Sequence, residues 1–228
     1  MQLDLHPTTP PTFSLAERDR RWELARQLMD RAGVDALIVY GDREGTGPAP
    51  FAPDTWFTND RPGSIVVVPR HAEPIAPVMF PMAVADHIEA TRRGEQLWIR
   101  PENIWVARHA DGVVQALREH KLERSTIGVL GLEPYPPYYF TPPLPTRLWH
   151  DVTQALPEAR FTPVWRQFIM ATLRQSDEEL AVLACRPGQG RPWPGLCWTP
   201  PDQAPARATC TLRSLPPTAT RRPLRACC

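Results

Sequence analysis

The sequence predicts an α/β fold, with a layered mixed sheet flanked by helices and followed by a disordered tail. Two observations predict it. Short apolar runs typical of strands alternate with amphipathic helical segments along residues 14–175, and residues 185–228 lose both patterns at once. We therefore divide the chain into a flexible N-terminus (1–13), an α/β domain (14–175), the start of a further helix (176–184) and the tail (185–228). A domain of this size buries roughly 70% of the surface that its unfolded chain exposes, so it is expected to fold by itself.

The first predicted helix begins at a capping box. The side chains of Ser14 and Glu17 can each satisfy a free backbone amide at a helix start. Gly33 marks its end, because the C-terminus of a helix often needs a positive φ. The apolar run DALIVYG follows and suits a strand that is buried on both faces. Apolar residues at helical spacing define the buried side of this helix: Trp22, Ala25, Met29 and Ala32.

The remaining elements of the domain follow in order and alternate between the two types. Residues 63–80 predict two strands that are joined by a polar turn at 70–73. After them we expect a helix at 84–94, a strand at 103–107, a helix at 110–121, a strand at 125–133, a helix at 146–156, a strand at 160–165 and a helix at 166–174.

A glycine-rich segment at residues 41–47 (GDREGTG) follows the first predicted strand, as phosphate-binding loops do. Such a loop needs a helix N-terminus directly after it, to aim backbone amides at the anion. The prolines of residues 48–56 predict an irregular loop instead. Nucleotide binding is therefore not expected.

His87 and Glu89 have the His-x-Glu spacing of zinc deaminases. That chemistry also needs two thiolates, and residues 1–184 contain no cysteine, so we expect a partly exposed helix face here. The other histidines show no metal-binding spacing, and the Gly-x-Ser-x-Gly elbow of serine hydrolases does not occur. The sequence therefore predicts no catalytic and no metal-ligating residue.

The loop at residues 134–145 is rich in proline and holds three of the four tyrosines of the chain. Stiff aromatic segments suit an interface or the rim of a pocket. The alternative is a loop that folds over the core of its own domain. If the chain is a stand-alone binding or assembly module, this loop is its contact surface. The candidate interface residues are Tyr135, Tyr138, Tyr139 and Phe140.

Three stretches together resemble the N-terminal domain of the creatinase, prolidase and aminopeptidase P family: RRWELARQLMDRAGVDALIVYG, SIVVVPRHAEPIAPV and MATLRQSDEELAVL. The likeness covers residues 14–184 in order. In the last stretch Arg174, Ser176 and Glu179 match the residues with which family members start the helix that leads into their catalytic domain. Gln175 departs from the family, which usually has lysine there. WFTNDRPGS is a second departure, near the place where the family often has Tyr-Leu-Thr-Gly.

The resemblance implies a non-catalytic domain that supports homo-oligomerisation and shapes the entrance of the active site. In that family the chemistry belongs to a C-terminal metallopeptidase domain. There two aspartates, a histidine and two glutamates hold two divalent metal ions (Mn, Co or Zn) that activate a water molecule. Residues 185–228 contain one aspartate and no glutamate or histidine, so no metal ligand can be carried over. We expect a chain that is cut off before the catalytic domain, binds no cofactor and is inactive by itself.

The tail, residues 185–228, differs from the rest of the chain in charge and composition. It holds nine prolines, and its seven arginines against one acidic residue give it a net charge of +6. Because the whole chain carries a net charge of +1, residues 1–184 carry −5. It also holds all five cysteines, and their spacing lacks the Cys-x(2–4)-Cys knuckle of zinc sites. The cysteines are Cys185, Cys197, Cys210, Cys227 and Cys228.

Three explanations of the tail stay open. It can be a disordered basic segment that contacts nucleic acid or an acidic partner, a proline-rich ligand segment, or the product of a reading-frame shift. The composition changes in mid-helix near Ala184, whereas linkers usually begin after an element has ended. This position favours the frameshift, and a nucleic-acid partner is not expected.

The sequence also predicts where the protein resides. Its start, MQLDLHPTTPPTF, lacks the positive and apolar regions of a secretory signal. No run approaches the roughly 18 apolar residues that a membrane span requires. The absence of cysteine from residues 1–184 fits a reducing compartment. We therefore expect a cytoplasmic protein without a membrane partner.

Overall fold

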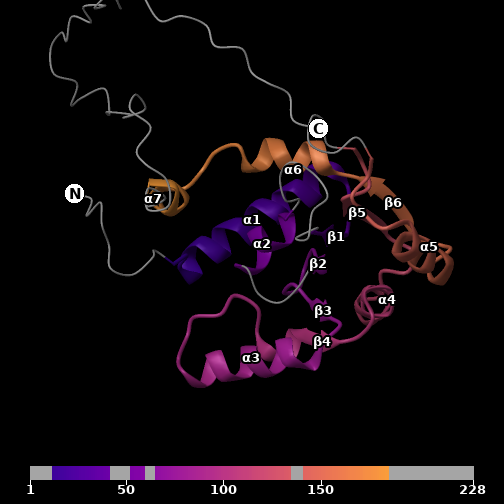
Figure 1. Cartoon of the computed structure of the whole chain (residues 1–228). Helices are drawn as coiled ribbons and strands as arrows, with labels where there is room; N and C mark the ends of the chain where they lie inside the picture. Colours follow the sequence, from indigo (N-terminus) through magenta and orange to yellow (C-terminus); the bar gives the residue numbers. More distant parts are fainter. Residues whose placement is uncertain (1–11, 42–51, 60–64, 135–140, 185–228) are drawn as a thin grey trace, which may run out of the picture. The chain divides into compact units, whose positions relative to one another are not determined.

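The computed structural model describes residues 12–41, 52–59, 65–134 and 141–184 (Figure 1). All of these belong to one structural unit, which spans residues 1–186. The predicted flexible N-terminus, apart from Thr12 and Phe13, and the predicted disordered or frameshifted tail lie outside the described residues.

A four-stranded sheet forms the centre of the domain. Its strands are β1 (Ala36–Tyr40), β2 (Ile65–Pro69), β5 (Thr126–Leu130) and β6 (Arg160–Pro163), in the order β2-β1-β5-β6. β1 pairs antiparallel with β2 and parallel with β5, and β5 pairs parallel with β6. The predicted mixed sheet is confirmed.

A second, smaller sheet consists of β3 (Ala76–Val78) and β4 (Ile104–Val106), which run parallel. β2 and β3 are the two strands predicted within residues 63–80. They meet at a single bridge between Val67 and Ile75. The predicted turn therefore joins two sheets and does not close a long hairpin.

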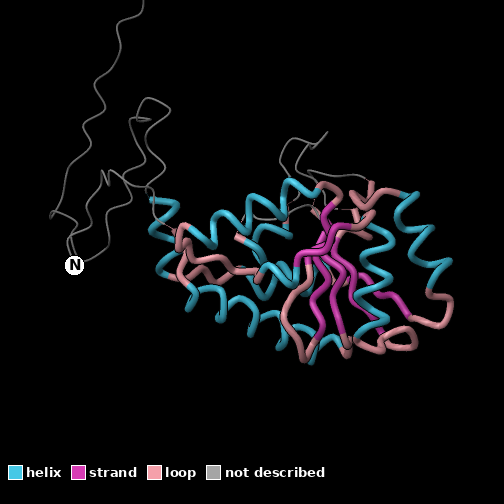
Figure 2. The backbone as a smooth tube through the Cα atoms, turned by 90° about the horizontal axis from the view of Figure 1, so that it is seen from below, coloured by secondary structure: helices cyan, strands magenta, loops and turns pink. Residues whose placement is uncertain are grey.

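Helices lie on both sides of the strands (Figure 2). No helix in the described ranges is both long and apolar enough to cross a lipid bilayer. The helices are α1 (Leu15–Ala32), α2 (Pro53–Thr58), α3 (Pro81–Arg92), α4 (His109–Glu119), α5 (Thr146–Ala155), α6 (Trp165–Thr172) and α7 (Asp177–Ala184), and a short 3₁₀ turn spans Pro101–Asn103.

The alternation of side chains along β1 creates the layers. Successive residues of a strand point to opposite faces. Leu37 and Val39 pack in a core with residues of α1, α2 and α6. Ala36 and Ile38 pack in a second core with residues of α4 and α5. The prediction that this strand is buried on both faces is confirmed, and the result is a helix–sheet–helix arrangement.

Helix α1 has the ends and most of the buried face that the sequence predicts. The Ser14 Oγ accepts a hydrogen bond from the Glu17 backbone N–H at 3.1 Å, and Gly33 has a left-handed φ of 64°. Trp22, Ala25 and Met29 are buried, and Leu28 joins them. Two charged residues of α1, Glu17 and Arg21, are also buried, which the helical pattern of apolar residues does not predict.

Helix α2 corrects the expectation of an irregular loop in residues 48–56. Its first residue is Pro53, and proline is well tolerated there because the first helical N–H needs no partner within the helix. Phe57 of α2 is fully buried in the core shared with α1 and α6, so tertiary packing stabilises this short helix. The glycine-rich residues 42–47 lie outside the described part of the chain.

His87 corrects a second expectation. Its neighbours Ile88 and Glu89 are exposed on α3, but His87 itself is only 1% exposed. Its Nε2 atom is in hydrogen-bonding contact with the backbone oxygen of Ile99. The imidazole therefore ties α3 to the segment before β4, on the face of the helix that the sequence pattern expected to be partly exposed.

A substitution at Gly128 tests how closely β5 packs in the sheet. A Cβ atom at this position would lie 2.8 Å from the Leu37 Cδ2 and 3.1 Å from the Val164 side chain. Gly128→Ala is therefore expected to lower the free energy of unfolding by about 1–3 kcal/mol through overpacking. Urea denaturation of the full chain measures this loss, and an unchanged midpoint would contradict the close packing.

Candidate functional site

The start of α7 contains two of the three residues that the resemblance singled out. The Ser176 backbone N–H donates to a carboxylate oxygen of Glu179 at 2.8 Å, and the Glu179 backbone N–H donates to the Ser176 Oγ at 3.1 Å. These reciprocal bonds form a complete capping box, which satisfies two free amides and sets the point where the helix begins.

Acidic residues of α7 bind the N-terminal half of α1. Glu179 forms ion pairs of 3.0 Å with both Arg20 and Arg21. Glu178 accepts hydrogen bonds from the backbone N–H of Ser14 at 2.8 Å and from its Oγ at 2.7 Å. The N-termini of the two helices are therefore joined, although Ser14 and Glu178 are 164 positions apart in the sequence.

These contacts correct the predicted capping box of α1. The predicted partner of the Ser14 backbone N–H is Glu17, but Glu178 of α7 accepts that hydrogen bond. The Glu17 carboxylate turns instead toward the next turn of its own helix. It accepts hydrogen bonds of 2.7–2.8 Å from Arg20 and one of 2.7 Å from Arg21. Only the Ser14 half of the predicted box is present.

The Glu17 carboxylate is the buried centre of this junction. Its side chain is 2% exposed and that of Arg21 is 5% exposed. Burial raises the pKa of Glu17, but hydrogen bonds from Arg20, Arg21 and Ser176 outweigh burial, so the pKa lies below its ordinary value. The hydrogen bond to Glu17 raises the pKa of Arg20. Each partner therefore favours the charged form of the other.

Aromatic rings complete the surroundings of Arg21. Its guanidinium carbon lies 4.3 Å from the ring centre of Phe13, 5.1 Å from that of Trp98 and 5.5 Å from that of Trp56. Its Nη1 donates to the backbone oxygen of Trp56 at 3.2 Å. Cation–π attraction and charge pairing hold the same side chain. Arg21 thus connects α1, α2, α7 and the segment before β4.

The third residue singled out by the resemblance, Arg174, behaves differently. It is exposed, and within the described ranges it forms no ion pair. The sequence analysis also missed Arg20, Arg21 and Glu178, which the structure brings to the junction. Their only signal in the sequence is the high density of charged residues in RDRR and SDEE, and a pattern of that kind is also typical of a solvated helix face.

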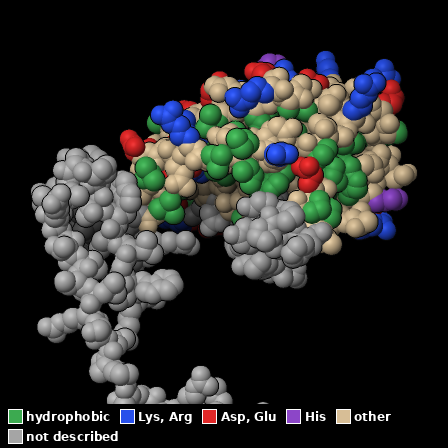
Figure 3. Space-filling model, turned by 90° about the horizontal axis from the view of Figure 1, so that it is seen from above, with side chains coloured by type: hydrophobic (Ala, Val, Ile, Leu, Met, Phe, Trp, Pro, Cys, Tyr) green, Lys and Arg blue, Asp and Glu red, His purple; other side chains and the backbone are tan. Residues whose placement is uncertain are grey.

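Four large apolar side chains of α6, of its C-cap residue and of α7 are about half to two-thirds exposed, and none of the apolar residues 180–183 is buried. Figure 3 shows the face of the molecule that carries α6 and α7, with apolar side chains gathered on it. The residues of this α6–α7 apolar face are Met170 and Leu173 (65% each), Leu180 (51%) and Leu183 (48%).

Within the described part of the chain, neither the predicted aromatic interface nor a metal-binding group adds residues to this site. Tyr135, Tyr138, Tyr139 and Phe140 lie outside the described residues. Within the described ranges, no group of three or more His, Cys, Asp or Glu side chains could hold a metal ion. The residues present therefore do not fit the metal pair that the resemblance implies for full-length proteins.

Comparison with known proteins gives the following similarities. No protein-family model and no curated protein matches the chain. Among solved structures, the chain is similar to the Xaa-Pro dipeptidase from Bacillus anthracis, with 14% identity, a TM-score of 0.47, and coverage of 72% of this chain and 38% of that one. It is also similar to the X-Pro aminopeptidase from Thermotoga maritima MSB8, with 13% identity, a TM-score of 0.49, and coverage of 70% and 38%.

A third similar structure is the N-terminal domain of the cytoplasmic peptidase PepQ from Mycobacterium tuberculosis H37Rv, with 9% identity and a TM-score of 0.43. The similarity covers 67% of this chain and 98% of that domain. The chain thus spans about two fifths of the first two proteins and nearly all of the third.

Proposed function

We propose that this chain is the non-catalytic N-terminal domain of a metal-dependent hydrolase similar to Xaa-Pro aminopeptidases and prolidases. In this proposal α7 is the start of the helix that leads into the catalytic domain. One observation carries it: the capping box of Ser176 and Glu179, which the sequence resemblance singled out, is bound to α1 by the ion pairs of Glu179 with Arg20 and Arg21.

The way in which α7 is held supports this role. An isolated helix of eight residues is too short to be stable in water. Hydrogen bonds and ion pairs at its N-terminus fix where α7 begins, while none of the apolar residues 180–183 is buried in the domain. This arrangement suits a segment that must leave the domain at a defined point and find its main packing partner elsewhere.

The α6–α7 apolar face supplies the matching contact surface. Leu180 and Leu183 are three positions apart and therefore lie on one side of α7. Large exposed apolar patches often mark interaction sites. We assign this face to the catalytic domain, which would cover it when it follows α7.

The remaining parts of the proposal come from the resemblance. The domain would support homo-oligomerisation and shape the entrance of the active site, in a cytoplasmic enzyme that acts on Xaa-Pro peptides. The two metal ions would be held by the catalytic domain and would activate the attacking water. No catalytic step is assigned to the described residues.

An activity assay tests the non-catalytic role. The purified chain with Mn²⁺ or Co²⁺ is expected to release no product from Xaa-Pro dipeptides above the blank, because its described residues do not form a metal site. The Xaa-Pro dipeptidase from Bacillus anthracis serves as the positive control. Turnover by the purified chain would contradict the proposal.

The gene offers a test of the connection to a catalytic domain. The DNA downstream of the codon for Ala184 can be translated in the other two frames. A continuation of α7, followed by spaced aspartate, aspartate, histidine, glutamate and glutamate codons, would support both the domain assignment and the frameshift. Early stop codons in both frames would contradict the frameshift.

A further inference from the structure

Two charged side chains accompany the α6–α7 apolar face. Arg174 directly follows the C-cap residue of α6, and Asp177 is the first residue of α7. Both side chains are exposed. Within the described ranges neither forms an ion pair or a side-chain hydrogen bond, with the other or with any third residue. The face therefore combines apolar side chains with one free cation and one free anion.

Helical geometry places these two charges beside the apolar side chains. Leu173, the C-cap residue of α6, keeps a helical φ of −61° and ψ of −33°. Arg174 therefore lies four positions after Met170 on the same side of the helix. Asp177 is three positions before Leu180, so these two share one side of α7. Each charge is thus the neighbour of an apolar member of the face.

A face of this composition is complementary to itself. In a dimer with twofold symmetry the same surface of both copies meets, and each contact occurs twice. Arg174 of one copy can then pair with Asp177 of the other, around apolar side chains that are removed from water. Burial of the leucine and methionine side chains stabilises the contact, and the opposite charges set its register. A second copy of this chain satisfies both charges at once.

A second group of exposed apolar side chains, near the start of α3, lacks this arrangement. It includes Met82, which is 78% exposed. The two arginines at the end of α3 are already paired within the chain, Arg92 with Glu89 at 3.8 Å and Arg93 with Glu95 at 2.7 Å. The charges of α3 therefore offer less to a second copy than those beside α6 and α7.

We propose that the chain forms a homodimer with twofold symmetry through its α6–α7 apolar face, in which Arg174 of each copy pairs with Asp177 of the other. This inference goes beyond the proposed function and does not rest on it, because only the face and its two charges carry it. A catalytic domain bound to the same face would exclude the second copy, so the dimer is expected of the chain by itself. The activity assay and the gene test keep their meaning whether or not the dimer forms.

Sedimentation equilibrium of the full chain tests the proposal. A reducing agent prevents disulfides between the five cysteines of different copies. The average mass is expected to rise toward twice that of the chain between about 1 and about 300 µM, as suits a small interface. Leu180→Ser is expected to weaken dimerisation at least about tenfold, because it removes an apolar contact from both copies. Met82→Ser, which removes an exposed apolar side chain of α3, is the matched control and should change nothing.

Charge reversal tests the pairing itself. Arg174→Asp brings two carboxylates together in the dimer, and Asp177→Arg brings two guanidinium groups together. Each variant alone is therefore expected to dimerise about tenfold more weakly. An equimolar mixture of the two variants should regain the dimer, because every contact in the mixed dimer again joins opposite charges. A folding defect in either variant cannot produce this recovery.

Three results would overturn the proposal. The first is a chain that stays monomeric over the whole concentration range. The second is a dimer that Leu180→Ser leaves as tight as before, since the contact would then lie on another surface. The third is a mixture of the two charge variants that dimerises no better than either variant alone.

Discussion

Replacing Glu17 with glutamine is expected to lower the free energy of unfolding by about 3 kcal/mol. The carboxylate is buried and accepts hydrogen bonds from both Arg20 and Arg21. In the variant, Glu179 is the one described carboxylate left to pair with both Arg20 and Arg21, and the side chain of Arg21 is only 5% exposed. Two buried or half-buried positive charges then share one carboxylate, and this incomplete compensation is the main cost. Urea denaturation of the full chain at neutral pH measures the change.

An exposed ion pair provides the matched control for this substitution. Arg124 and Glu158 are 2.8 Å apart, but their side chains are 81% and 62% exposed. Glu158→Gln is expected to change the free energy of unfolding by less than about 1 kcal/mol, because solvent screens surface charges. Equal losses for Glu17→Gln and Glu158→Gln would show that burial of the junction contributes nothing.

The effect of Glu17 should also depend on pH. The folded-state pKa of this carboxyl is lower than its ordinary value of 4.5. The stabilisation is therefore fully present above about pH 4.5 and is lost as the pH falls through the folded-state pKa. The difference in unfolding free energy between the unaltered chain and Glu17→Gln should shrink as the pH is lowered from 7 into this range. A difference that stays constant would contradict ionisation of Glu17 as its source.

The fold was predictable from the sequence where the signal is local and periodic. The buried face of α1 repeats at helical spacing, and residues 36–40 within DALIVYG form a short apolar run. Both elements therefore follow from local sequence patterns. The residues of the junction lack such a signal. Ser14 and Glu178 bind one another across 164 positions, and a capping-box pattern at Ser14 equally fits the local partner, Glu17. Only the fold determines which glutamate accepts the bond.

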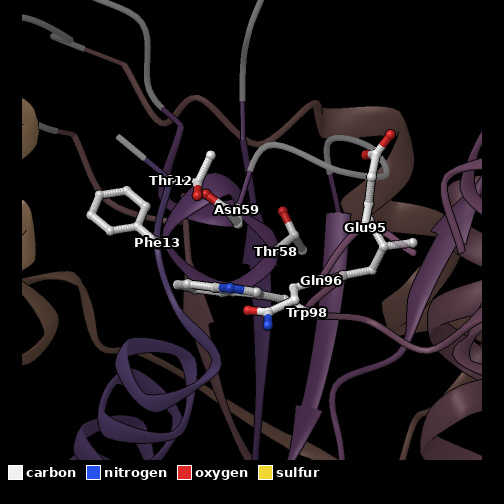
Figure 4. A pocket seen from close by; sticks show the side chains of 8 residues that line it. Thr12, Phe13, Thr58, Asn59, Glu95, Gln96 and Trp98 are labelled. Carbon is white, nitrogen blue, oxygen red and sulfur yellow. The ribbon is translucent and has the colours of Figure 1, made fainter. Parts of the chain in front are cut away.

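The pocket between residues 12–13, 58–59 and 95–98 (Figure 4) could not be predicted from the sequence, for a related reason. Its three lining segments are loops and element ends that acquire a common surface only when α2 and the segment before β4 meet α1. Trp98 stands in the short apolar run of residues 97–99, to which the sequence analysis assigned no helix or strand. His87 shows the same effect: a polar residue on a largely exposed helix becomes buried because Ile99 lies against it.

Replacing Phe57 with alanine is expected to lower the free energy of unfolding by about 3–5 kcal/mol. Phe57 is fully buried, and its ring centre lies 4.9 Å from that of Trp56 and 6.0 Å from that of Phe168 in α6. Its backbone oxygen accepts a hydrogen bond from the Trp22 Nε1 of α1 at 3.1 Å. The substitution therefore opens a cavity where three helices meet, in α2, whose first four residues belong to the segment predicted as an irregular loop.

Phe80→Ala is the control for this last substitution, because Phe80 precedes α3 and is 66% exposed. It removes the same number of atoms from the surface, where no cavity can form, so a change within about 0.5 kcal/mol is expected. Urea denaturation of the full chain compares the two variants. A similar small loss for both would mean that α2 contributes little to the core. A large loss for Phe57→Ala alone would show that burial of one aromatic side chain holds a helix which local sequence disfavours.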